Sequence, residues 1–166
     1  MAIFDLKRPT AAGTAVLVEI PHAGLAVPDS LRPIFQAPQD AIRTDADSAV
    51  DQLYEGACDV GATLLVAHQS RYVVDLNRAP DDVDLATVED HPAPRPQQAR
   101  GVVWRLTTDG RPALLRPLRS AELRDRLENY HAPYHRTLED ELVRLQAAHS
   151  FAVLLALVAM ECVRAR

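Results

Sequence analysis

The strongest pattern in the sequence is a long amphipathic helix that leads directly into an apolar strand. Between residues 120 and 148, apolar residues recur at intervals of three or four, which is typical of a helix with one buried face. Pro133 falls inside this pattern, so it either kinks the helix or begins a new one. The run FAVLLALVAM (151–160) follows and predicts a central strand that is buried on both faces, as in parallel sheets covered by helices.

Two further apolar runs predict strands earlier in the chain. TAVLVEI (14–20) lies between Gly13 and Pro21, and ATLLVA (62–67) follows Gly61. The segment between them predicts a helix that ends near Asp59 and is capped by Asp45 or Asp47. Strands that alternate with helices predict an α/β fold, here a three-layer sandwich around a mostly parallel sheet, built as one domain over residues 1–166.

The remaining segments are shorter. RYVVDLNR (71–78) reads as another extended stretch, and GVVWRL (101–106) reads as a short strand before a turn at residues 108–110. Residues 79–100 contain four prolines and little apolar periodicity, which predicts a surface loop or lid.

Composition excludes several classes of function. The net charge of −5 and pI of about 5.6 argue against a broad nucleic-acid surface, although 18 basic residues, all arginine except Lys7, could form local anion sites. The run at 151–160 is too short to cross a bilayer, and no signal peptide is visible, so we expect no membrane partner and a cytoplasmic location. Cys58 and Cys162 are expected to be thiols rather than a disulfide framework.

His22 lies in EIPHAG (19–24), where the first predicted core strand ends. In parallel sheets, ligands bind beyond the carboxyl ends of strands, which favours a functional role. A lone histidine, however, more often hydrogen-bonds a loop carbonyl than binds a metal. Asp45 and Asp47 lie nearby in sequence and could supply a carboxylate, although one of them could equally cap the following helix.

Arg71, Asn77 and Arg78 predict a site for a small acidic molecule. Guanidinium groups bind carboxylates bidentately, and an amide adds direction. The structural alternative is a surface salt bridge from Arg78 to Asp81 or Asp82.

His131 and His135 are spaced i,i+4, which could chelate zinc on a helix. Pro133 lies between them and no Glu follows the first histidine, so this is not the HExxH motif. A structural role is favoured, with His135 packed beside Tyr134.

Together these segments resemble the N-formylglutamate amidohydrolase family. The stretches that carry the resemblance are IPHAGLAVP (20–28), TDADSAVDQLYEGACDVGAT (44–63), SRYVVDLNRAPDD (70–82) and NYHAPYHRTLEDEL (129–142). The resemblance implies a phosphorylase/hydrolase-like α/β core similar to that of zinc carboxypeptidases. It also implies zinc held by His22 and Asp47, with Asp45 left open as the alternative. Arg71 would polarise the formyl carbonyl, and Asn77 and Arg78 would bind a substrate carboxylate.

One departure from the family pattern weakens the expected activity. The family's Asp-x-His-Ser-Met motif, which supplies another zinc ligand, is replaced by ALVAM (156–160). The glutamate expected to act as general base is also not visible, and Glu161 or Cys162 could substitute as a ligand only with difficulty. We therefore expect weak or absent activity for this chain alone, or a non-catalytic relative that binds a small acid or a partner. An uncovered sheet edge would also permit a homo-oligomer.

Overall fold

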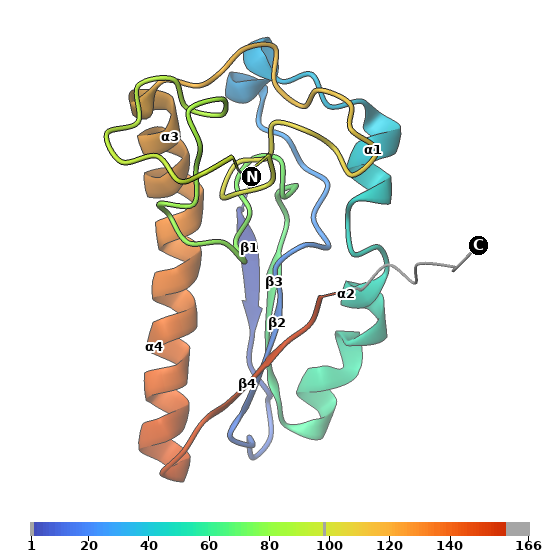
Figure 1. The fold of residues 1–166 in the computed structure, drawn as a ribbon. Coiled ribbons are helices and arrows are strands. Elements are labelled where there is room, and N and C mark those ends of the chain that lie inside the picture. Colours follow the sequence, from blue (N-terminus) through green and yellow to red (C-terminus); the bar gives the residue numbers. More distant parts are fainter. Residues whose placement is uncertain (1, 98, 159–166) are drawn as a thin grey trace, which may run out of the picture.

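Four strands form one sheet that lies between two helical layers in the computed structural model (Figure 1), which describes residues 2–97 and 99–158. The strands are β1 (Phe4–Lys7), β2 (Val16–Ile20), β3 (Thr63–Ala67) and β4 (Val153–Ala156), in the order β1-β3-β2-β4. β2 is parallel to both β3 and β4, and β1 is antiparallel to β3. This confirms the α/β class and the mostly parallel sheet; β1 was not predicted.

The predicted long helix covers one face of the sheet. It begins as α3 (Ser120–Arg126), passes through one π-helical turn, η3 (Leu127–His131), and continues as α4 (Ala132–His149). Pro133 stands in the first turn of α4, directly after the π-helical turn, and the backbone on both sides of the junction is helical. The helix therefore runs through Pro133 with a change from π-helical to α-helical geometry, and Pro133 does not begin a separate helix.

Shorter helices cover the opposite face of the sheet (Figure 1). They are α2 (Val50–Leu53) and the 3-10 helix η2 (Glu55–Val60). Another 3-10 helix, η1 (Asp29–Ile34), and α1 (Gln39–Thr44) precede them, and Ile42 of α1 packs with Tyr72 and Trp104 in the loops. None of the helices in the described part of the chain has the length and apolar character needed to cross a membrane.

Alternate residues of the central strands feed two separate cores. Leu17 and Leu65 pack in the core that also contains Tyr134 and Leu138 of α4. Their neighbours, including Val18, Ile20, Leu64 and Val66, pack on the other face with Ala57 of η2. Because both faces are covered, β2 and β3 need apolar residues at nearly every position, which is why they appear in the sequence as continuous apolar runs.

The prediction of a buried central strand at 151–160 is wrong for the residues that the structure describes. β4 spans only Val153–Ala156 and lies at the edge of the sheet, paired with β2 alone. Its valine and leucine side chains are 41–45% exposed, in keeping with an edge strand that has one paired neighbour in the described part of the chain. Residues 159–160 of the predicted strand lie outside the described residues.

The predicted helix from Asp45 or Asp47 to Asp59 is also wrong in detail. The chain forms α2 and η2 in its place, broken at Tyr54, and the residue before α2 is Ala49, with a left-handed φ of 66° and no side-chain cap. Neither aspartate caps the helix, because both carboxylates are engaged elsewhere. Gly61 does end this segment with a φ of 87°, as predicted.

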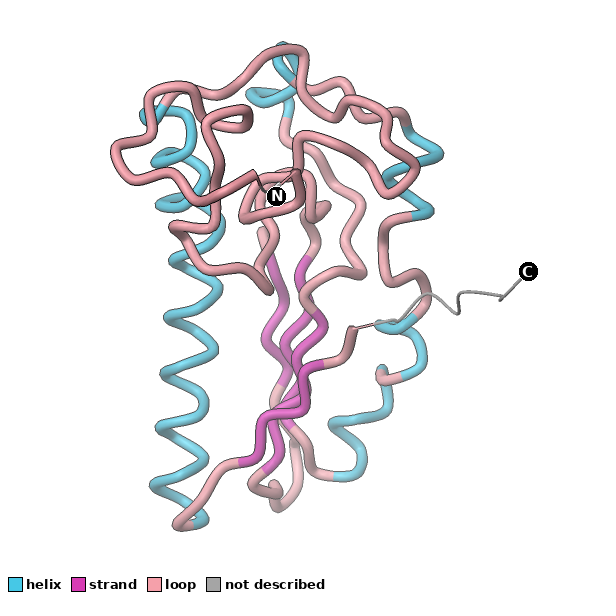
Figure 2. The backbone as a smooth tube through the Cα atoms, viewed as in Figure 1, coloured by secondary structure: helices cyan, strands magenta, loops and turns pink. Residues whose placement is uncertain are grey.

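The segments 71–78 and 101–106 do not form strands. Residues 71–78 fold into successive turns, in which Val73 N–H donates to Ser70 O and Arg78 N–H donates to Asp75 O. Residues 101–106 make only isolated bridges at their ends. These segments and most of the other long loops gather beyond the carboxyl ends of β2 and β3 (Figure 2). The expected turn at residues 108–110 is present, with Gly110 at φ 84°.

Gly24 allows two segments to approach more closely than any side chain would permit. Ala26 N–H donates to His68 O at 3.0 Å, and Ser70 N–H donates to Ala26 O at 2.9 Å. A Cβ on Gly24 would lie 2.2 Å from the carbonyl carbon of His68. The glycine of EIPHAG therefore lets the chain after His22 run alongside residues 67–70.

We predict that Gly24→Ala lowers the free energy of unfolding by about 2–4 kcal/mol, because the contact is with backbone that cannot move aside. Gly56→Ala is the matched control: its nearest contact would be an ordinary 3.7 Å, so we expect a change within about 1 kcal/mol. Urea unfolding of both variants measures this, and equal losses would contradict the explanation.

Glu141 ties α4 to the start of β3 and to the N-terminal segment. Its buried carboxylate accepts hydrogen bonds from Arg8 (2.8 Å), Arg144 (2.6 Å) and the hydroxyl of Thr63 (3.1 Å). Burial opposes ionisation, but these hydrogen bonds outweigh it and lower the pKa of Glu141 to about 2. The carboxylate therefore stabilises the fold above its unfolded pKa near 4.5, and this contribution is lost as the pH falls toward 2.

We predict that Glu141→Gln costs about 1–2 kcal/mol at pH 7, a range discounted because both guanidinium groups are partly exposed. The difference from the unchanged protein should shrink between pH 4.5 and pH 2. The exposed neighbour Glu139→Gln is the control and should be near neutral. Chemical unfolding at a series of pH values measures both, and a pH-independent difference would contradict the assignment.

Candidate active site

His22 lies just past the carboxyl end of β2, and only 2% of its surface is exposed. Its Nε2–H donates to Oδ1 of Asp75 at 2.8 Å. Its Nδ1 contacts the guanidinium group of Arg71 and lies 3.5 Å from Oδ2 of Asp47. Burial alone lowers the pKa of an imidazole, but hydrogen bonds with the two carboxylates outweigh it and raise the pKa of His22. His22 is therefore held by charged groups at both ring nitrogens rather than by a loop carbonyl.

Asp75 is the residue that joins the segments of this site. Besides His22, its carboxylate accepts a hydrogen bond from Asn77 N–H (2.9 Å) and from the indole N–H of Trp104 (2.9 Å). Burial opposes ionisation of this carboxylate, but the hydrogen bond and charge of His22, followed by Arg71 and the N–H of Asn77, lower its pKa. No role was predicted for Asp75 from the sequence. Its burial follows from the turns of residues 71–78, which the sequence did not predict.

The two aspartates of the TDAD segment face different ways. The carboxylate of Asp45 accepts hydrogen bonds from the Tyr72 hydroxyl and from the backbone N–H and hydroxyl of Thr108. Asp47 approaches His22 instead, and its own N–H donates to His22 O at 3.0 Å. Of the two alternatives left open by the sequence, Asp47 is the one beside the imidazole.

The predicted anion-binding residues line one cavity of about 460 Å³. It is lined by His22, Arg71, Asp75, Asn77, Arg78, Arg100, Trp104 and Val158. The guanidinium group of Arg71 stacks on the Trp104 ring at 4.8 Å, and that of Arg100 lies 5.7 Å from the same ring. Arg78 also makes the salt bridge weighed as its structural alternative, to Asp82 at 3.7 Å, but its side chain stays 43% exposed. The cavity thus presents three arginines to a ligand; Arg100 was missed because nothing in its sequence context distinguishes it.

The donors around His22 suit zinc in kind but are few in number. A neutral imidazole that donates Nε2–H to a carboxylate can bind a metal through Nδ1, and zinc-binding histidines usually have such a carboxylate on the other ring nitrogen. Asp47 adds a carboxylate oxygen near Nδ1. Within residues 2–97 and 99–158, no group of three or more His, Cys, Asp or Glu side chains is arranged to hold a metal. A third protein ligand would have to come from residues other than His22 and Asp47. Glu161 and Cys162 lie outside the described residues.

His131 and His135 do not form a metal site. Their rings stack at 4.2 Å, and each Nε2 bonds a backbone carbonyl, of Arg78 and Leu76 respectively, at 3.0 Å. His135 packs edge-on against Tyr134 at 5.7 Å, as predicted.

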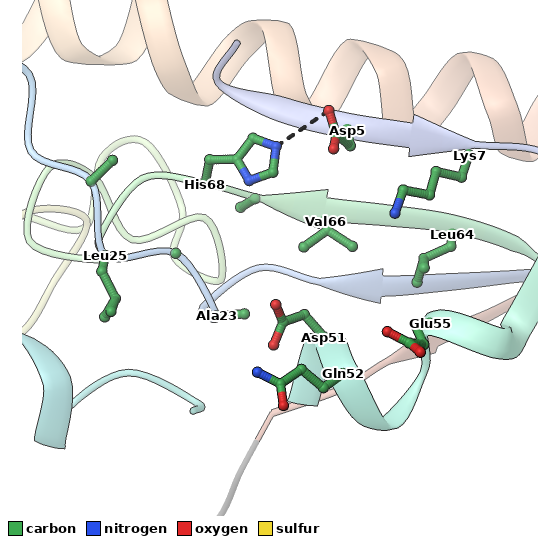
Figure 3. Close-up of a pocket in the computed structure, with 13 residues that line it drawn as sticks. Asp5, Lys7, Ala23, Leu25, Asp51, Gln52, Glu55, Leu64, Val66 and His68 are labelled. Atoms are coloured by element: carbon green, nitrogen blue, oxygen red, sulfur yellow. Dashed lines mark ion pairs between the residues drawn. The ribbon is translucent and has the colours of Figure 1, made fainter. Parts of the chain in front are cut away.

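A second cavity, of about 450 Å³, lies beside the other face of the sheet (Figure 3). His68 and Asp5 face each other across its upper wall as an ion pair of 3.3 Å, and Asp51 and Glu55 project from the opposite side. None of the predicted site residues lines this cavity, so the candidate site is the one that contains His22.

Comparison with known proteins gives this geometry a family. Residues 14–166 match the family model described as N-formylglutamate amidohydrolase. The chain belongs to the N-formylglutamate amidohydrolase family. N-formylglutamate deformylases from Pseudomonas aeruginosa and Pseudomonas putida are each 36% identical over 84% of this chain and 49% of their own length. The chain therefore spans about half the length of these curated relatives.

A solved structure agrees with the family assignment. The N-formylglutamate amidohydrolase from Ralstonia eutropha JMP134 superposes with a TM-score of 0.86 at 29% identity, over 96% of this chain and 59% of that one. The gene product Atu2144 from Agrobacterium tumefaciens, at 17% identity and a TM-score of 0.67, shares the fold over 93% of this chain and 55% of its own. The predicted family and its fold are thus confirmed.

We predict that Asp75→Asn lowers the pKa of His22, because it removes one of the two carboxylates that favour the imidazolium form. Asp45→Asn is the matched control: it is equally buried but bonds Tyr72 and Thr108, so the His22 titration should not move. NMR titration of the imidazole in chelator-treated protein measures both. An unchanged His22 titration in Asp75→Asn would contradict the proposed coupling.

Proposed function

We propose that this chain carries the active site of a zinc-dependent amidohydrolase that cleaves N-formylglutamate, or a related N-acyl acidic amino acid. N-formylglutamate would yield formate and glutamate. The observation that carries the proposal is the convergence of buried His22 and Asp75 with three arginines on one cavity, with the carboxylate of Asp47 3.5 Å from Nδ1 of His22. Relatives named N-formylglutamate deformylase support the choice of substrate.

His22 and Asp47 are the residues that would hold zinc. Zinc bound there would lower the pKa of a water molecule and make it a nucleophile near neutral pH. By accepting the Nε2 proton, Asp75 would leave the lone pair of Nδ1, which contacts Arg71 and lies 3.5 Å from Asp47, for the metal. Arg71, held between Asp75 and the face of Trp104, would donate to the formyl oxygen as negative charge develops on it.

The substrate carboxylates would bind at the other cationic groups of the cavity. Arg78 and Arg100 would supply planar guanidinium groups, and Asn77, which lines the same cavity, would supply an amide. N-formylglutamate carries two carboxylates, so a cavity with three arginines leaves a cation for the formyl oxygen as well. Each carboxylate of an acidic substrate would pair with an arginine, whereas a neutral substrate would leave these guanidinium groups without a partner. The cavity should therefore favour the acidic substrate.

A non-catalytic relative that binds a small acid is the second candidate. Two observations favour it. The residues at the end of β4 and just after it, Ala156 to Val158, have no metal-binding side chain, and only His22 and Asp47 among the described residues are placed to bind zinc. It would keep the arginine-lined cavity without turnover. The cytoplasmic location and the homo-oligomer stay predictions in either case.

We predict stoichiometric zinc and measurable formate release in the purified chain, and loss of both in His22→Ala. Removing one of two protein ligands should reduce turnover by at least about 100-fold. His149→Ala, at the far end of α4, is the matched control and should retain both properties. Elemental metal analysis and a formate-release assay measure them.

The outcomes separate the two candidates. Zinc together with turnover that depends on His22 would exclude the non-catalytic relative. No zinc and no turnover, with glutarate still raising the melting temperature and Arg78→Ala abolishing that shift, would exclude the enzyme.

A further inference from the structure

The loop of residues 71–78 carries most of the cavity's chemistry but has no regular secondary structure of its own. Arg71, Asp75, Asn77 and Arg78 all lie on it, and it is built from consecutive turns. Turns leave many backbone carbonyls without a partner inside the segment, and buried carbonyls must be paired elsewhere. The geometry of the site therefore depends on the groups that donate hydrogen bonds to these carbonyls.

The long helix supplies the missing donors from three side chains. Arg126 donates through one terminal nitrogen to the carbonyls of Val73 (2.9 Å) and Tyr72 (3.2 Å). His135 and His131 donate to the carbonyls of Leu76 and Arg78, each at 3.0 Å. Four carbonyls of one eight-residue loop are thus held by one helix.

Arg126 is an unusual residue to place at such a contact. Its side chain is fully buried, and burial lowers its pKa to about 10, so it still carries its charge at neutral pH. Burying a guanidinium group is costly unless strong acceptors surround it. The two carbonyls of this loop accept the hydrogen bonds that offset part of that cost.

The π-helical turn η3 brings the three donors to the same side of the helix. Arg126 and His131 are five residues apart. In a regular α-helix their side chains would point about 140° apart around the helix axis. In η3 the bond from Ala132 N–H to Leu127 O spans five residues, so one residue is in effect inserted and the separation falls to about 40°. His135 then follows one α-turn after His131, with the two rings stacked.

We propose that Arg126, His131 and His135 are positioning residues that hold the 71–78 loop in the shape that binds an acidic ligand, with η3 setting their register. The inference rests on the proposed function for the identity of the ligand. None of the three lines the cavity, so each acts through the loop backbone rather than by touching the ligand. Fixing the carbonyls of Leu76 and Arg78 fixes the points from which Asn77 and Arg78 reach into the cavity.

Paired substitutions test the histidines. His131→Leu and His135→Leu remove the N–H donor, whereas His131→Gln and His135→Gln keep one. The control is His149→Leu, the same change at the far end of α4. Two readouts are needed: the dissociation constant of glutarate and of L-glutamate by calorimetry, and amide hydrogen exchange of residues 71–79, with exchange of β2 and β3 as the check on folding.

We expect the leucine variants to weaken binding about fivefold to thirtyfold and to speed exchange in the loop while β2 and β3 stay protected. The glutamine variants should recover to within about threefold, and His149→Leu should change neither readout. Unchanged exchange in the loop of the leucine variants, or equal losses in the leucine and glutamine variants, would overturn the proposal.

Arg78→Ala separates failure of this inference from failure of the proposed function. If Arg78→Ala abolishes binding while the leucine variants bind normally, the proposed site stands and the positioning role falls. If neither ligand binds the unchanged protein, the choice of ligand fails, and the loop exchange in the leucine variants still decides the positioning role.

Discussion

The buried carboxylate of Asp75 is the interaction on which the rest of the site depends. It joins the end of β2, through His22, to the indole of Trp104 and to its own loop through Asn77 N–H. A buried carboxylate without partners would be too costly to stay ionised, so these donors must be in place together. The same contacts orient His22 toward Asp47 and hold Arg71 nearby, so that one anion organises both halves of the cavity.

Different parts of the fold provide stability and carry the residues of the candidate site. β2 and β3, packed on both faces, provide a rigid edge at which His22 is presented. The groups that would meet a ligand lie on turns beyond that edge, which are held by side chains of the long helix as well as by their own turn hydrogen bonds. This arrangement lets the sequence of the loop be chosen for binding, because the helix supplies the rigidity.

The chain's relation to its family is uneven along its length. His22 and the loop of residues 71–78 meet at one cavity, with Asp47 beside His22. The superposition on the Ralstonia eutropha protein covers nearly the whole chain but only 59% of that protein. β4, by contrast, ends in small and apolar residues and leaves its leucines exposed at a sheet edge. The site is therefore well formed on the side of β2 and has few donors on the side of β4.

The sequence by itself determined the α/β class, the buried strands β2 and β3, the long helix and the family, because these follow from periodicity and motif, which are local properties of the chain. It also predicted that His22, Arg71, Asn77 and Arg78 share a site, and the structure places all four on one cavity. Only the tertiary structure placed Asp47, the preferred of the two aspartates, beside His22, revealed Asp75 and Arg100, and turned residues 71–78 from an expected strand into a loop. Those outcomes depend on contacts between segments that are far apart in the sequence, such as His22 with Asp75 and Val73 with Arg126, which no local pattern encodes.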